Sequence, residues 1–523
     1  MNCAMNGDDI LERAYGTIPE LIRGHAARAP ARPALIQDGD SVDYAGLDAL
    51  MDRVAAALQR DGVLPTQSVA ICASTSIAYA AVFLGSLRAG VAVAPLATSS
   101  TAEGLAAMLE DAGARLLFLD RAAAELLAPV AGEMAAVRVA LDGSDAGIAL
   151  SDWLAAPGAA PAAVALQPEW PFNIIYSSGT TGTPKGIVQS HAMRWAHVQR
   201  GSLFGYGPET LTLCATPLYS NTTLVSFLPT LTLGGAAVLM AKFDVAGYLE
   251  LAERHRVTHT MLVPVQYQRI MDHADFGRRD LSSFRMKFCT SAPFSAALKA
   301  DILARWPGGL IEYYGMTEGG GTCILAAHEH PDKLATVGRP GPGHDIRVID
   351  EAGRELPAGE TGEVVGRSPA MMSGYHRQPD KTAEAEWHDA EGRRFIRTGD
   401  LGRFDADGFL TLFDRKKDMI ISGGFNVYPS DLEAVLQGHP GVAEAAVVGV
   451  PSRRWGETPV AFAVPAPGAA LTAPELLGWA NERLGKTQRL AALEIVASLP
   501  RSAIGKVLKR ELRDSYRAAH EQS

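Results

Sequence analysis

The sequence predicts an α/β protein with a large N-terminal domain, made of two α/β subdomains plus a β subdomain, and a small α+β C-terminal domain. A chain of 523 residues exceeds what one hydrophobic core usually supports, so more than one domain is expected. Short apolar runs alternate with helix-like patterns up to about Gly338, and glycine turns separate short strand-like runs after it. We expect a large domain over residues 1–413, a hinge over 414–418 and a small domain over 419–523.

The first α/β subdomain is predicted between Ile18 and about Leu150. Its clearest elements are a helix-like pattern at Leu47–Leu58 and strand-like runs at Ser68–Ala73, Val91–Pro95 and Arg115–Leu119. The most apolar stretch, Ala80–Leu96, is too short and too interrupted to span a bilayer, so we expect a buried helix followed by a strand. A segment rich in proline and alanine, Ala155–Pro168, then indicates a linker between subdomains.

The second α/β subdomain is predicted from this linker to about Gly338, and the β subdomain from there to Phe413. Strand-like runs in the second subdomain lie at Leu211–Ala215, Ala236–Met240 and His259–Pro264. Those of the β subdomain lie at Asp345–Asp350, Gly362–Gly366, Arg394–Thr398 and Gly408–Phe413. The charged cluster Asp414–Asp418 follows, and we predict the domain boundary there.

Composition limits the partners and the compartment. The formal net charge of −10 disfavours nucleic acid as a partner. The five cysteines are scattered and contain no Cys-x-x-Cys pair, so we expect neither a disulfide framework nor a zinc site. The acidic N-terminal residues do not resemble a signal peptide, and no membrane span is expected. A cytoplasmic protein fits best.

A loop rich in glycine and hydroxyl groups, within Tyr176–Val188, predicts a site for nucleotide phosphates. Its glycines allow tight turns that direct backbone N–H groups at an anion, and a lysine adds positive charge. The candidate ligands are Ser177, Ser178, Gly179, Thr180, Thr181, Gly182, Thr183 and Lys185. The spacing differs from that of the common NTPase loop, so this is a different phosphate loop. A solvated turn is the ordinary alternative.

Three further segments carry residues that suit nucleotide chemistry. The segment Glu312–Glu318 combines aromatic rings, a hydroxyl and a carboxylate, which could stack on a base, contact a phosphate and hold Mg²⁺; a buried tyrosine pair is the alternative. Asp400 follows a Thr-Gly pair and could accept hydrogen bonds from ribose, although most such turns bind nothing. Lys506 follows a glycine turn, and a surface lysine is its alternative.

Five motifs occur in a fixed order: Tyr176–Val188, Pro217–Thr223, Tyr313–Glu318, Thr398–Glu433 and Leu499–Lys506. Together they resemble the adenylate-forming superfamily of acyl-CoA synthetases, aryl-CoA ligases, luciferases and peptide-synthetase adenylation domains. The chain is most similar to the AMP-forming acyl-CoA and aryl-CoA synthetases, such as 4-coumarate or feruloyl-CoA ligases and fatty-acyl-CoA synthetases. The resemblance implies ATP-dependent activation of a carboxylic acid to acyl-AMP and then transfer to CoA. It also implies a small C-terminal domain that is mobile.

The resemblance assigns roles to individual residues. Lys506 would be the catalytic lysine, while Thr181, Lys185 and Glu318 would support the reaction at the phosphates. Glu318 and Thr181 would hold Mg²⁺. By the same resemblance, Thr317 would lie by the α-phosphate, and Asp400 and Arg415 would contact the ribose. Tyr314 would pack on adenine, with the turn Ser291, Ala292 and Pro293 nearby. The remaining nucleotide contacts would come from Glu312, Tyr313, Gly315 and Met316. A fixed cation offsets the repulsion between a carboxylate and a phosphate that approach each other in a dry cleft.

The same resemblance implies a CoA site and a hinge in the C-terminal part. Gly423 and Gly424 would line the pantetheine path, where a side chain would block it. Trp455 would pack on the CoA nucleotide with Arg453 or Arg454 near its phosphates, and a buried tryptophan is an equally good interpretation. Lys417 would be the hinge residue, although a plain surface charge is the alternative. No carrier-protein segment follows Lys506, which favours free CoA as the acceptor.

The acid is predicted to be an apolar monocarboxylate that binds near Tyr219, Ser220, Asn221, Thr222, Tyr313 and Gly319. The usual histidine after the aromatic residue of this motif is replaced by Ser220. Leu224–Phe227 lacks the aspartate of amino-acid-activating relatives, and Tyr313 stands where malonate-activating relatives place an arginine. We therefore favour an aromatic or arylpropenoic acid over a medium- or long-chain fatty acid.

Other functions stay open on sequence alone. They are a stand-alone adenylation enzyme that loads a carrier protein, a luciferase-like oxidative enzyme and a non-catalytic acyl-nucleotide sensor. Four intact candidate residues, Glu318, Asp400, Arg415 and Lys506, argue against the sensor. The oligomeric state is not determined by these patterns, and a dimer is compatible with them.

Overall fold

The structure, a computed structural model, describes residues 12–177, 185–415, 418–422, 425–452, 455–485, 488–502 and 505–520. Its contacts divide the chain into two compact units. The first comprises Met1–Asp345 and Gly366–Ile396, and the second comprises Ile346–Val365 and Arg397–Ser523. The predicted domains over 1–413 and 419–523 and the predicted hinge over 414–418 stay predictions.

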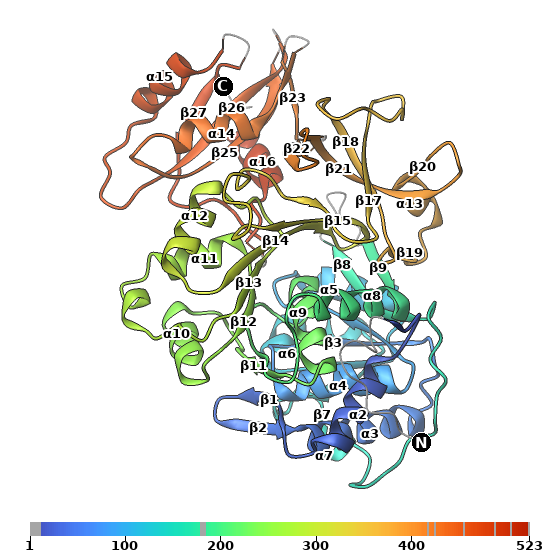
Figure 1. The fold of residues 1–523 in the computed structure, drawn as a ribbon. Helices are drawn as coiled ribbons and strands as arrows, with labels where there is room; N and C mark the ends of the chain where they lie inside the picture. Colours follow the sequence, from blue (N-terminus) through green and yellow to red (C-terminus); the bar gives the residue numbers. More distant parts are fainter. Residues whose placement is uncertain are drawn as a thin grey trace. The chain divides into compact units, whose positions relative to one another are not determined.

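The first unit contains two large sheets built mainly from parallel strands (Figure 1). One sheet has the spatial order β16 (Arg339–Pro340), β15 (Gly319–Ala326), β14 (Gly309–Met316), β13 (Met286–Cys289), β12 (His259–Leu262), β10 (Leu211–Cys214), β11 (Ala236–Leu239), β1 (Pro33–Gln37), β2 (Asp40–Asp43). The other has the order β19 (Gly374–Tyr375), β9 (Lys185–Ser190), β8 (Pro171–Ser177), β4 (Ala92–Pro95), β3 (Ser68–Cys72), β5 (Leu116–Leu119), β6 (Val137–Ala140), β7 (Ile148–Ala149).

The two sheets exchange strands in a way that the expected subdomain boundaries missed. Strand β1 pairs with β11 in parallel, with Leu35 opposite Ala237, so the start of the chain joins the later sheet. Strand β8 lies after the linker but pairs with β4, with Asn173 opposite Val93. The prediction of consecutive subdomains over 18–150 and onward to Gly338 is therefore wrong in this respect. Apolar periodicity identifies a strand but contains no information about its partner.

Helices of the first unit are α2 (Ile18–Arg28), α3 (Tyr44–Arg60), α4 (Ile77–Arg88), α5 (Ala102–Ala112), α6 (Arg121–Leu127), α7 (Leu150–Trp153), α8 (His191–Ser202), α9 (Asn221–Thr232), α10 (Val245–Arg254), α11 (Pro264–Met271), α12 (Ala296–Arg305) and α13 (Pro379–Glu384), with 3₁₀ turns at Ala128–Glu133 and Phe276–Arg278. Polar side chains start several of them: Asp43 accepts from the Gly46 N–H at 2.7 Å before α3. The predicted helix over Leu47–Leu58 lies inside α3, and Ala80–Leu96 forms α4 and β4 as expected.

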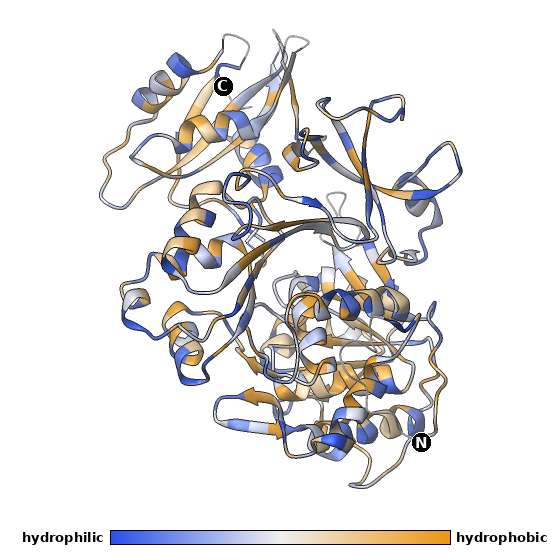
Figure 2. Ribbon diagram, viewed as in Figure 1, coloured by the Kyte–Doolittle hydropathy of each residue, from blue (hydrophilic) through white to orange (hydrophobic). Residues whose placement is uncertain are grey.

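Hydrophobic residues concentrate in these strands and on the inner helix faces (Figure 2). Strands β3, β4 and β5 are buried at every position, as expected for parallel strands covered on both faces. Four cysteines, Cys72, Cys214, Cys289 and Cys323, are buried free thiols. No helix in the described ranges is both long and apolar enough to cross a membrane.

The second unit begins with the predicted β segment. Its strands are β17 (Asp345–Ile349), β18 (Gly362–Arg367), β21 (Arg394–Phe404) and β22 (Leu410–Arg415); β20 (Glu386–His388), in the first unit, pairs with the start of β21. The prediction that Thr398–Asp400 ends a strand is wrong, because β21 continues to Phe404. Gly399 has φ +70° and the pairing register shifts just after Asp400, so the strand forms a bulge there and does not stop.

The C-terminal part of the second unit is an α+β sandwich. Its elements are β23 (Ile420–Ser422), β24 (Phe425–Val427), α14 (Pro429–Gln437), β25 (Val442–Ser452), β26 (Gly456–Pro465), α15 (Ala473–Arg483), β27 (Ala492–Ile495) and α16 (Lys509–His520). Alternate residues of β25 separate two cores: Val447 packs with Leu432 of α14 and Leu476 of α15, whereas Val448 packs with Leu512 of α16. Helices therefore cover both faces of this sheet.

Candidate active site

The ends of the predicted phosphate loop are held together by a strand pair. Ser177 closes β8 and Lys185 opens β9, and the two residues are antiparallel partners. The other candidate ligands of this loop, Ser178, Gly179, Thr180, Thr181, Gly182 and Thr183, lie outside the described residues. A phosphate loop that connects two paired strands has a fixed origin and a fixed return point.

Tyr375 lies between two of the predicted phosphate-site residues. Its hydroxyl donates a hydrogen bond to Glu318 Oε1 at 2.9 Å, and Lys185 Nζ lies 5.2 Å from the centre of its ring. Strand β19 pairs with β9, with Tyr375 opposite Ile187, which fixes the position of the ring. The structure therefore brings Glu318 and Lys185 to the same tyrosine, although their segments are far apart in sequence.

The Glu318 carboxylate is suitable for magnesium. It is partly exposed, and it forms no ion pair with any residue in the described ranges, so its oxygens keep free coordination sites. Described side chains contain no group of three His, Cys, Asp or Glu that could hold a metal by itself. Magnesium commonly uses one or two carboxylates together with phosphate oxygens, and a single Glu318 fits that pattern. The second predicted ligand, Thr181, lies outside the described residues.

A network of buried polar side chains holds the backbone of Thr317. Gln189 Nε2 donates to the Thr317 carbonyl at 2.7 Å, and Arg194 donates to the Gln189 side chain and to Asn173 Oδ1 at 3.1 Å. Burial lowers the pKa of Arg194 to about 9. Because Gln189 is fully buried and belongs to β9, this network ties the strand after the phosphate loop to the predicted α-phosphate contact.

The segment Glu312–Met316 forms the end of β14. Glu312 is buried and forms an ion pair with Lys299 of α12; burial raises the pKa of its carboxyl, and the ammonium opposes that rise. Tyr313 and Tyr314 both keep partial exposure, and their role beside the nucleotide stays a prediction. Tyr314 is opposite Cys323 on β15, and its partly exposed ring remains compatible with packing on adenine.

The predicted adenine turn touches the predicted acid segment. Ser291 has φ +81°, an unfavourable conformation for a residue with a side chain. Its Oγ is 2.7 Å from Thr222 Oγ1, at the start of α9. Ala292 and Pro293 continue the turn. Backbone strain that is retained at one residue and held by a part-buried hydrogen bond is typical of functional sites.

Most polar groups of the predicted acid segment already have protein partners. Burial raises the pKa of Tyr219, and the hydroxyls of Ser99 and Thr98 oppose that rise. Ser220 is the N-cap of α9 and accepts from the Thr222 N–H at 3.2 Å. Asn221 Oδ1 is buried with no hydrogen-bond partner among the described residues, so it is the acceptor that this segment leaves available.

The other two residues of the predicted acid pocket have different environments. Tyr313 stacks on Phe288 with ring centres 5.6 Å apart and meets Phe204 edge to face at 5.8 Å. Gly319 has φ +78°, and a Cβ there would lie 1.9 Å from the carbonyl oxygen of Ala370. Gly319 is therefore required by the backbone itself, in addition to any role beside the acid.

In the second unit, the two predicted ribose contacts are opposite each other. Asp400 of β21 and Arg415 of β22 are antiparallel partners in register. The Asp400 N–H donates to Thr398 Oγ1 at 3.0 Å, and that hydroxyl donates to the Val364 carbonyl at 2.8 Å. One strand pair thus positions both residues.

Lys506 occupies a tight loop that is closed by its own backbone. Ser502 N–H donates to the Lys506 carbonyl and Gly505 N–H donates to the Ser502 carbonyl, each at 2.8 Å. Gly505 has φ +76°, which favours glycine. Arg501 supports the loop, since it donates to the Gly505 carbonyl and to Glu444 Oε2, both at 2.6 Å. Lys506 is partly buried, which differs from the alternative of a plain surface lysine.

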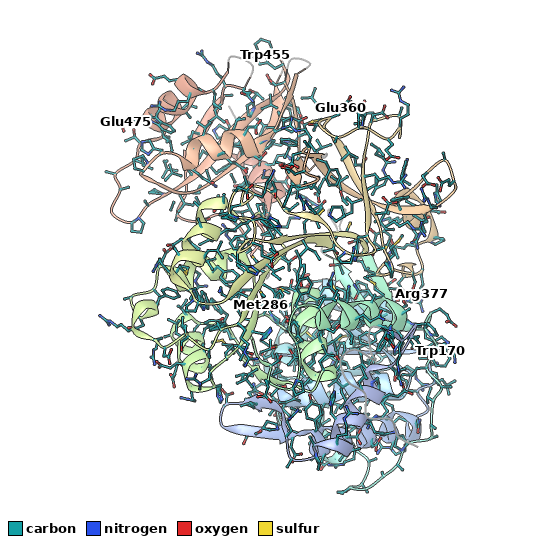
Figure 3. The ribbon with its side chains drawn as sticks, viewed as in Figure 1. Trp170, Met286, Glu360, Arg377, Trp455 and Glu475 are labelled. Carbon is teal, nitrogen blue, oxygen red and sulfur yellow. The ribbon has the colours of Figure 1, made fainter. Side chains whose placement is uncertain are left out.

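Trp455 is the predicted CoA contact that the structure describes. It is 48 % exposed and points outward from the end of the β25–β26 hairpin (Figure 3), so the alternative of a buried tryptophan is wrong. Gly423, Gly424, Arg453 and the predicted hinge residue Lys417 lie outside the described residues.

Sequence patterns did not identify Tyr375 or Arg501 as candidate site residues. Arg501 is adjacent to Ser502 in the motif that contains Lys506, and its pairing with Glu444 could have been inferred only from the fold. Tyr375 had one available signal, the Ser-Gly-Tyr turn at residues 373–375, which resembles many other turns. Both residues act through side-chain contacts between distant segments, which sequence spacing does not reveal.

Comparisons with known proteins agree with this arrangement. The family described as AMP-binding enzyme matches residues 22–376, and the AMP-binding enzyme C-terminal domain matches residues 431–506. The chain is 34% identical over 514 residues to the fatty acid–[acyl-carrier-protein] ligase ScoC of Streptomyces coeruleorubidus, covering 96% of each chain. It is 34% identical over 501 residues to a feruloyl-CoA synthase of Amycolatopsis sp, covering 94% of this chain and 97% of the relative.

Solved structures show the same similarity. ATP-bound MatB from Rhodopseudomonas palustris superposes with a TM-score of 0.87 at 30% identity, over 97% of this chain and 100% of that one. The fold and the ordered motifs thus define an enzyme that forms adenylates, and the predicted class of AMP-forming acid–thiol ligase is confirmed. The chain belongs to the AMP-binding enzyme family.

Proposed function

We propose that this enzyme uses ATP to convert an aromatic or arylpropenoic acid into its acyl-AMP and then transfers the acyl group to CoA, releasing AMP. One observation carries the proposal: the 2.7 Å hydrogen bond between Thr222 and Ser291 joins the segment predicted for the acid to the turn predicted for adenine. A carboxylate that attacks the α-phosphate must lie next to the nucleotide, and this contact supports such an arrangement.

Two cations have distinct roles in this proposal. Lys506 brings positive charge to the acid carboxylate and the α-phosphate, which lowers the repulsion between two anions. Lys185 supports the β- and γ-phosphates that leave as pyrophosphate. Magnesium, held by Glu318 and Thr181, supplies further neutralisation of the phosphates when it is bound. Tyr375 orients the Glu318 carboxylate for that purpose.

The aromatic assignment is supported by the rings around Tyr313. Phe204, Phe288 and Tyr313 form a continuous aromatic group, and flat substrates gain from offset or edge-to-face contact with such rings. Similarity to a feruloyl-CoA synthase points in the same direction. A cytoplasmic location stays a prediction.

A second candidate is a ligase that loads a fatty acid on an acyl-carrier protein. The observation that favours it is the 34% identity to ScoC over 96% of each chain. The acceptor distinguishes the two candidates, since one transfers to free CoA and the other to a protein-bound phosphopantetheine thiol.

The test is acid-dependent release of AMP, measured with ATP and magnesium over a panel of ring acids and fatty acids. Each acid is assayed with CoA and, separately, with a phosphopantetheinylated carrier protein. Thioester formation from a ring acid and CoA supports the proposal. Turnover restricted to fatty acids with the carrier protein would replace it by the second candidate, and absence of pyrophosphate exchange with every acid would refute both.

A further inference from the structure

Arg200 is a cation in the first unit that no carboxylate of the described ranges neutralises. It lies in the last turn of α8 and makes one long hydrogen bond, from Nη1 to Thr322 Oγ1 at 3.4 Å. Surrounding protein lowers the pKa of its guanidinium from the ordinary value, yet the residue keeps partial exposure. A guanidinium has five N–H donors, and only one hydrogen bond to the described residues uses them.

The guanidinium belongs to the aromatic group beside the predicted acid pocket. It lies over the ring of Tyr313, 4.9 Å from the ring centre. Tyr313 stacks on Phe288, which in turn stacks on Tyr206 at 5.6 Å. Cation–π contact with Tyr313 stabilises the charge in part, but it uses none of the in-plane N–H donors. Arg200 therefore offers a directed donor group at the edge of an otherwise apolar surface.

Neighbouring titratable groups do not balance this charge. His344 Nδ1 accepts from the Thr322 N–H at 2.8 Å, and burial, with Arg200, lowers the pKa of His344 to about 4. Burial together with Arg200 also lowers the pKa of His197. An imidazole side chain carries no negative charge whether or not it is protonated, so neither histidine balances Arg200.

We propose that Arg200 binds an acceptor oxygen at the end of the acid remote from the reacting carboxylate, so that the enzyme selects acids with a distal carboxylate or hydroxyl. This inference rests on the proposed function, because it takes Tyr313 as part of the acid pocket. The planar fork of arginine matches a carboxylate through two parallel hydrogen bonds and also donates to a hydroxyl oxygen. A plain alkyl or phenyl end would leave the guanidinium unpaired.

The test compares kcat/KM for AMP release within two matched sets of acids. One set is cinnamate, 4-hydroxycinnamate and 4-carboxycinnamate; the other is decanoate and decanedioate. Wild-type enzyme is expected to prefer an oxygenated acid of a set over the plain acid by about tenfold to a hundredfold, the usual worth of a hydrogen bond to a charged group. The preferred member of the ring set identifies the oxygen as carboxylate or hydroxyl.

Arg200→Met keeps the apolar stem and removes the donors, so this preference is expected to collapse; Arg200→Lys is expected to restore part of it. Gln199→Met, on the same helix, controls for general damage and retains the wild-type preference. Equal kcat/KM for plain and oxygenated acids in the wild type would overturn the inference, even if Arg200→Met failed to fold. An unchanged ratio in folded Arg200→Met would also overturn it.

Failure of the proposed function gives a different pattern. If ring acids are inactive and the aliphatic pair reacts, the aromatic assignment is wrong, while the ratio of decanedioate to decanoate still decides the role of Arg200. If ring acids react without any preference for the distal oxygen, the proposed function stands and the role of Arg200 is refuted.

Discussion

The hydroxyl of Tyr375 donates to the carboxylate of Glu318 at 2.9 Å, across a separation of 57 residues in sequence. This bond restricts the orientation of the carboxylate, and the ring of the same tyrosine contacts Lys185. Groups that support a ligand residue commonly affect binding almost as strongly as the ligand itself. Tyr375 is thus a positioning residue for the predicted magnesium ligand.

Tyr375→Phe removes this bond and keeps the ring. We expect the magnesium concentration for half-maximal adenylation to rise by about tenfold, the lower end of effects at such supporting residues. Magnesium titration of acid-dependent pyrophosphate exchange measures it. Tyr44→Phe is the control: it deletes buried hydrogen bonds to the carbonyls of Leu231 and Gly235, so stability should fall while the magnesium response stays. An unaltered magnesium response in Tyr375→Phe would show that the bond is merely structural.

Lys506→Ala should abolish formation of the acyl-AMP, because the charge that offsets the two approaching anions is lost. Supplied acyl-AMP should still be converted to thioester, since no phosphate attack is then required. Single-turnover assays of the two half-reactions test this. Lys509→Ala, which removes an ion pair with Glu433 in the same region, should retain both half-reactions. Equal loss of both halves in Lys506→Ala would contradict the assignment.

Lys417→Pro should reduce thioester formation and spare adenylation, because proline fixes φ at the predicted hinge. Lys417→Ala removes the charge without fixing φ, so it should behave like the wild type. Rapid-quench experiments test this. We expect acyl-AMP to accumulate before CoA is added and the acyl group to pass slowly to CoA afterwards. If Lys417→Pro transferred the acyl group at the wild-type rate, Lys417 would not be the hinge residue.

Gly319→Ala should destabilise the enzyme by more than about 4 kcal/mol, because the new methyl group collides with the Ala370 backbone as well as straining φ. Gly343 has a similar φ of +75° with open space around it. Gly343→Ala should therefore cost only about 1–2 kcal/mol, the price of the left-handed conformation. Chemical denaturation measures the loss in the free energy of unfolding for each variant. Equal losses would show that the structure adjusts so that the methyl group at residue 319 no longer collides with the backbone.

Acid should destabilise the fold through buried histidines. Burial lowers the pKa of His191 to about 4 from its ordinary 6.5, and the same holds for His259. Their contribution to stability is complete above pH 6.5 and is lost as the pH falls towards 4, because the unfolded chain binds the protons. Between these two pH values, the free energy of unfolding falls by up to about 1.4 kcal/mol per pH unit for each histidine.

His191→Leu removes one of these titrating groups. From pH 7 to pH 5.5, the free energy of unfolding should therefore fall by about 1 kcal/mol less in this variant than in the wild type. Denaturation midpoints at the two pH values provide the measurement. His388→Leu replaces an exposed histidine and serves as the matched control for a histidine-to-leucine change. A pH dependence in His191→Leu identical to that of the wild type would mean that this ring is not the titrating group.

Sequence patterns predicted where strands and helices lie, but they did not predict which strands pair with each other. The strand at Ser68–Cys72 and the helix at Ile77–Arg88 follow from their apolar runs, because burial of such runs is a local property of the chain. The pairing of β1 with β11 depends on segments about 200 residues apart, for which no local pattern exists. The motif residues were recognisable from their order along the chain.

Residues that act through long-range contacts could not be recognised in this way. Tyr375 is an example, because its contact with Glu318 spans 57 residues of the sequence. Arg200 appears in sequence as one of several charged residues on an ordinary helix. Only the packing of Tyr313 and Thr322 around it shows that its charge lacks a partner among the described residues.

The hydrogen bond between Thr222 and Ser291 has a consequence for anyone who redesigns the acid specificity. Thr222 belongs to the segment that a designer would change first, whereas Ser291 depends on that hydroxyl to keep an unfavourable backbone conformation. In the proposed function, in which the Ser291 turn contacts adenine, enlarging the acid pocket at this position would also weaken ATP binding. Selection for a new acid would act on two substrates at once, and useful variants would come more readily from positions around Tyr313.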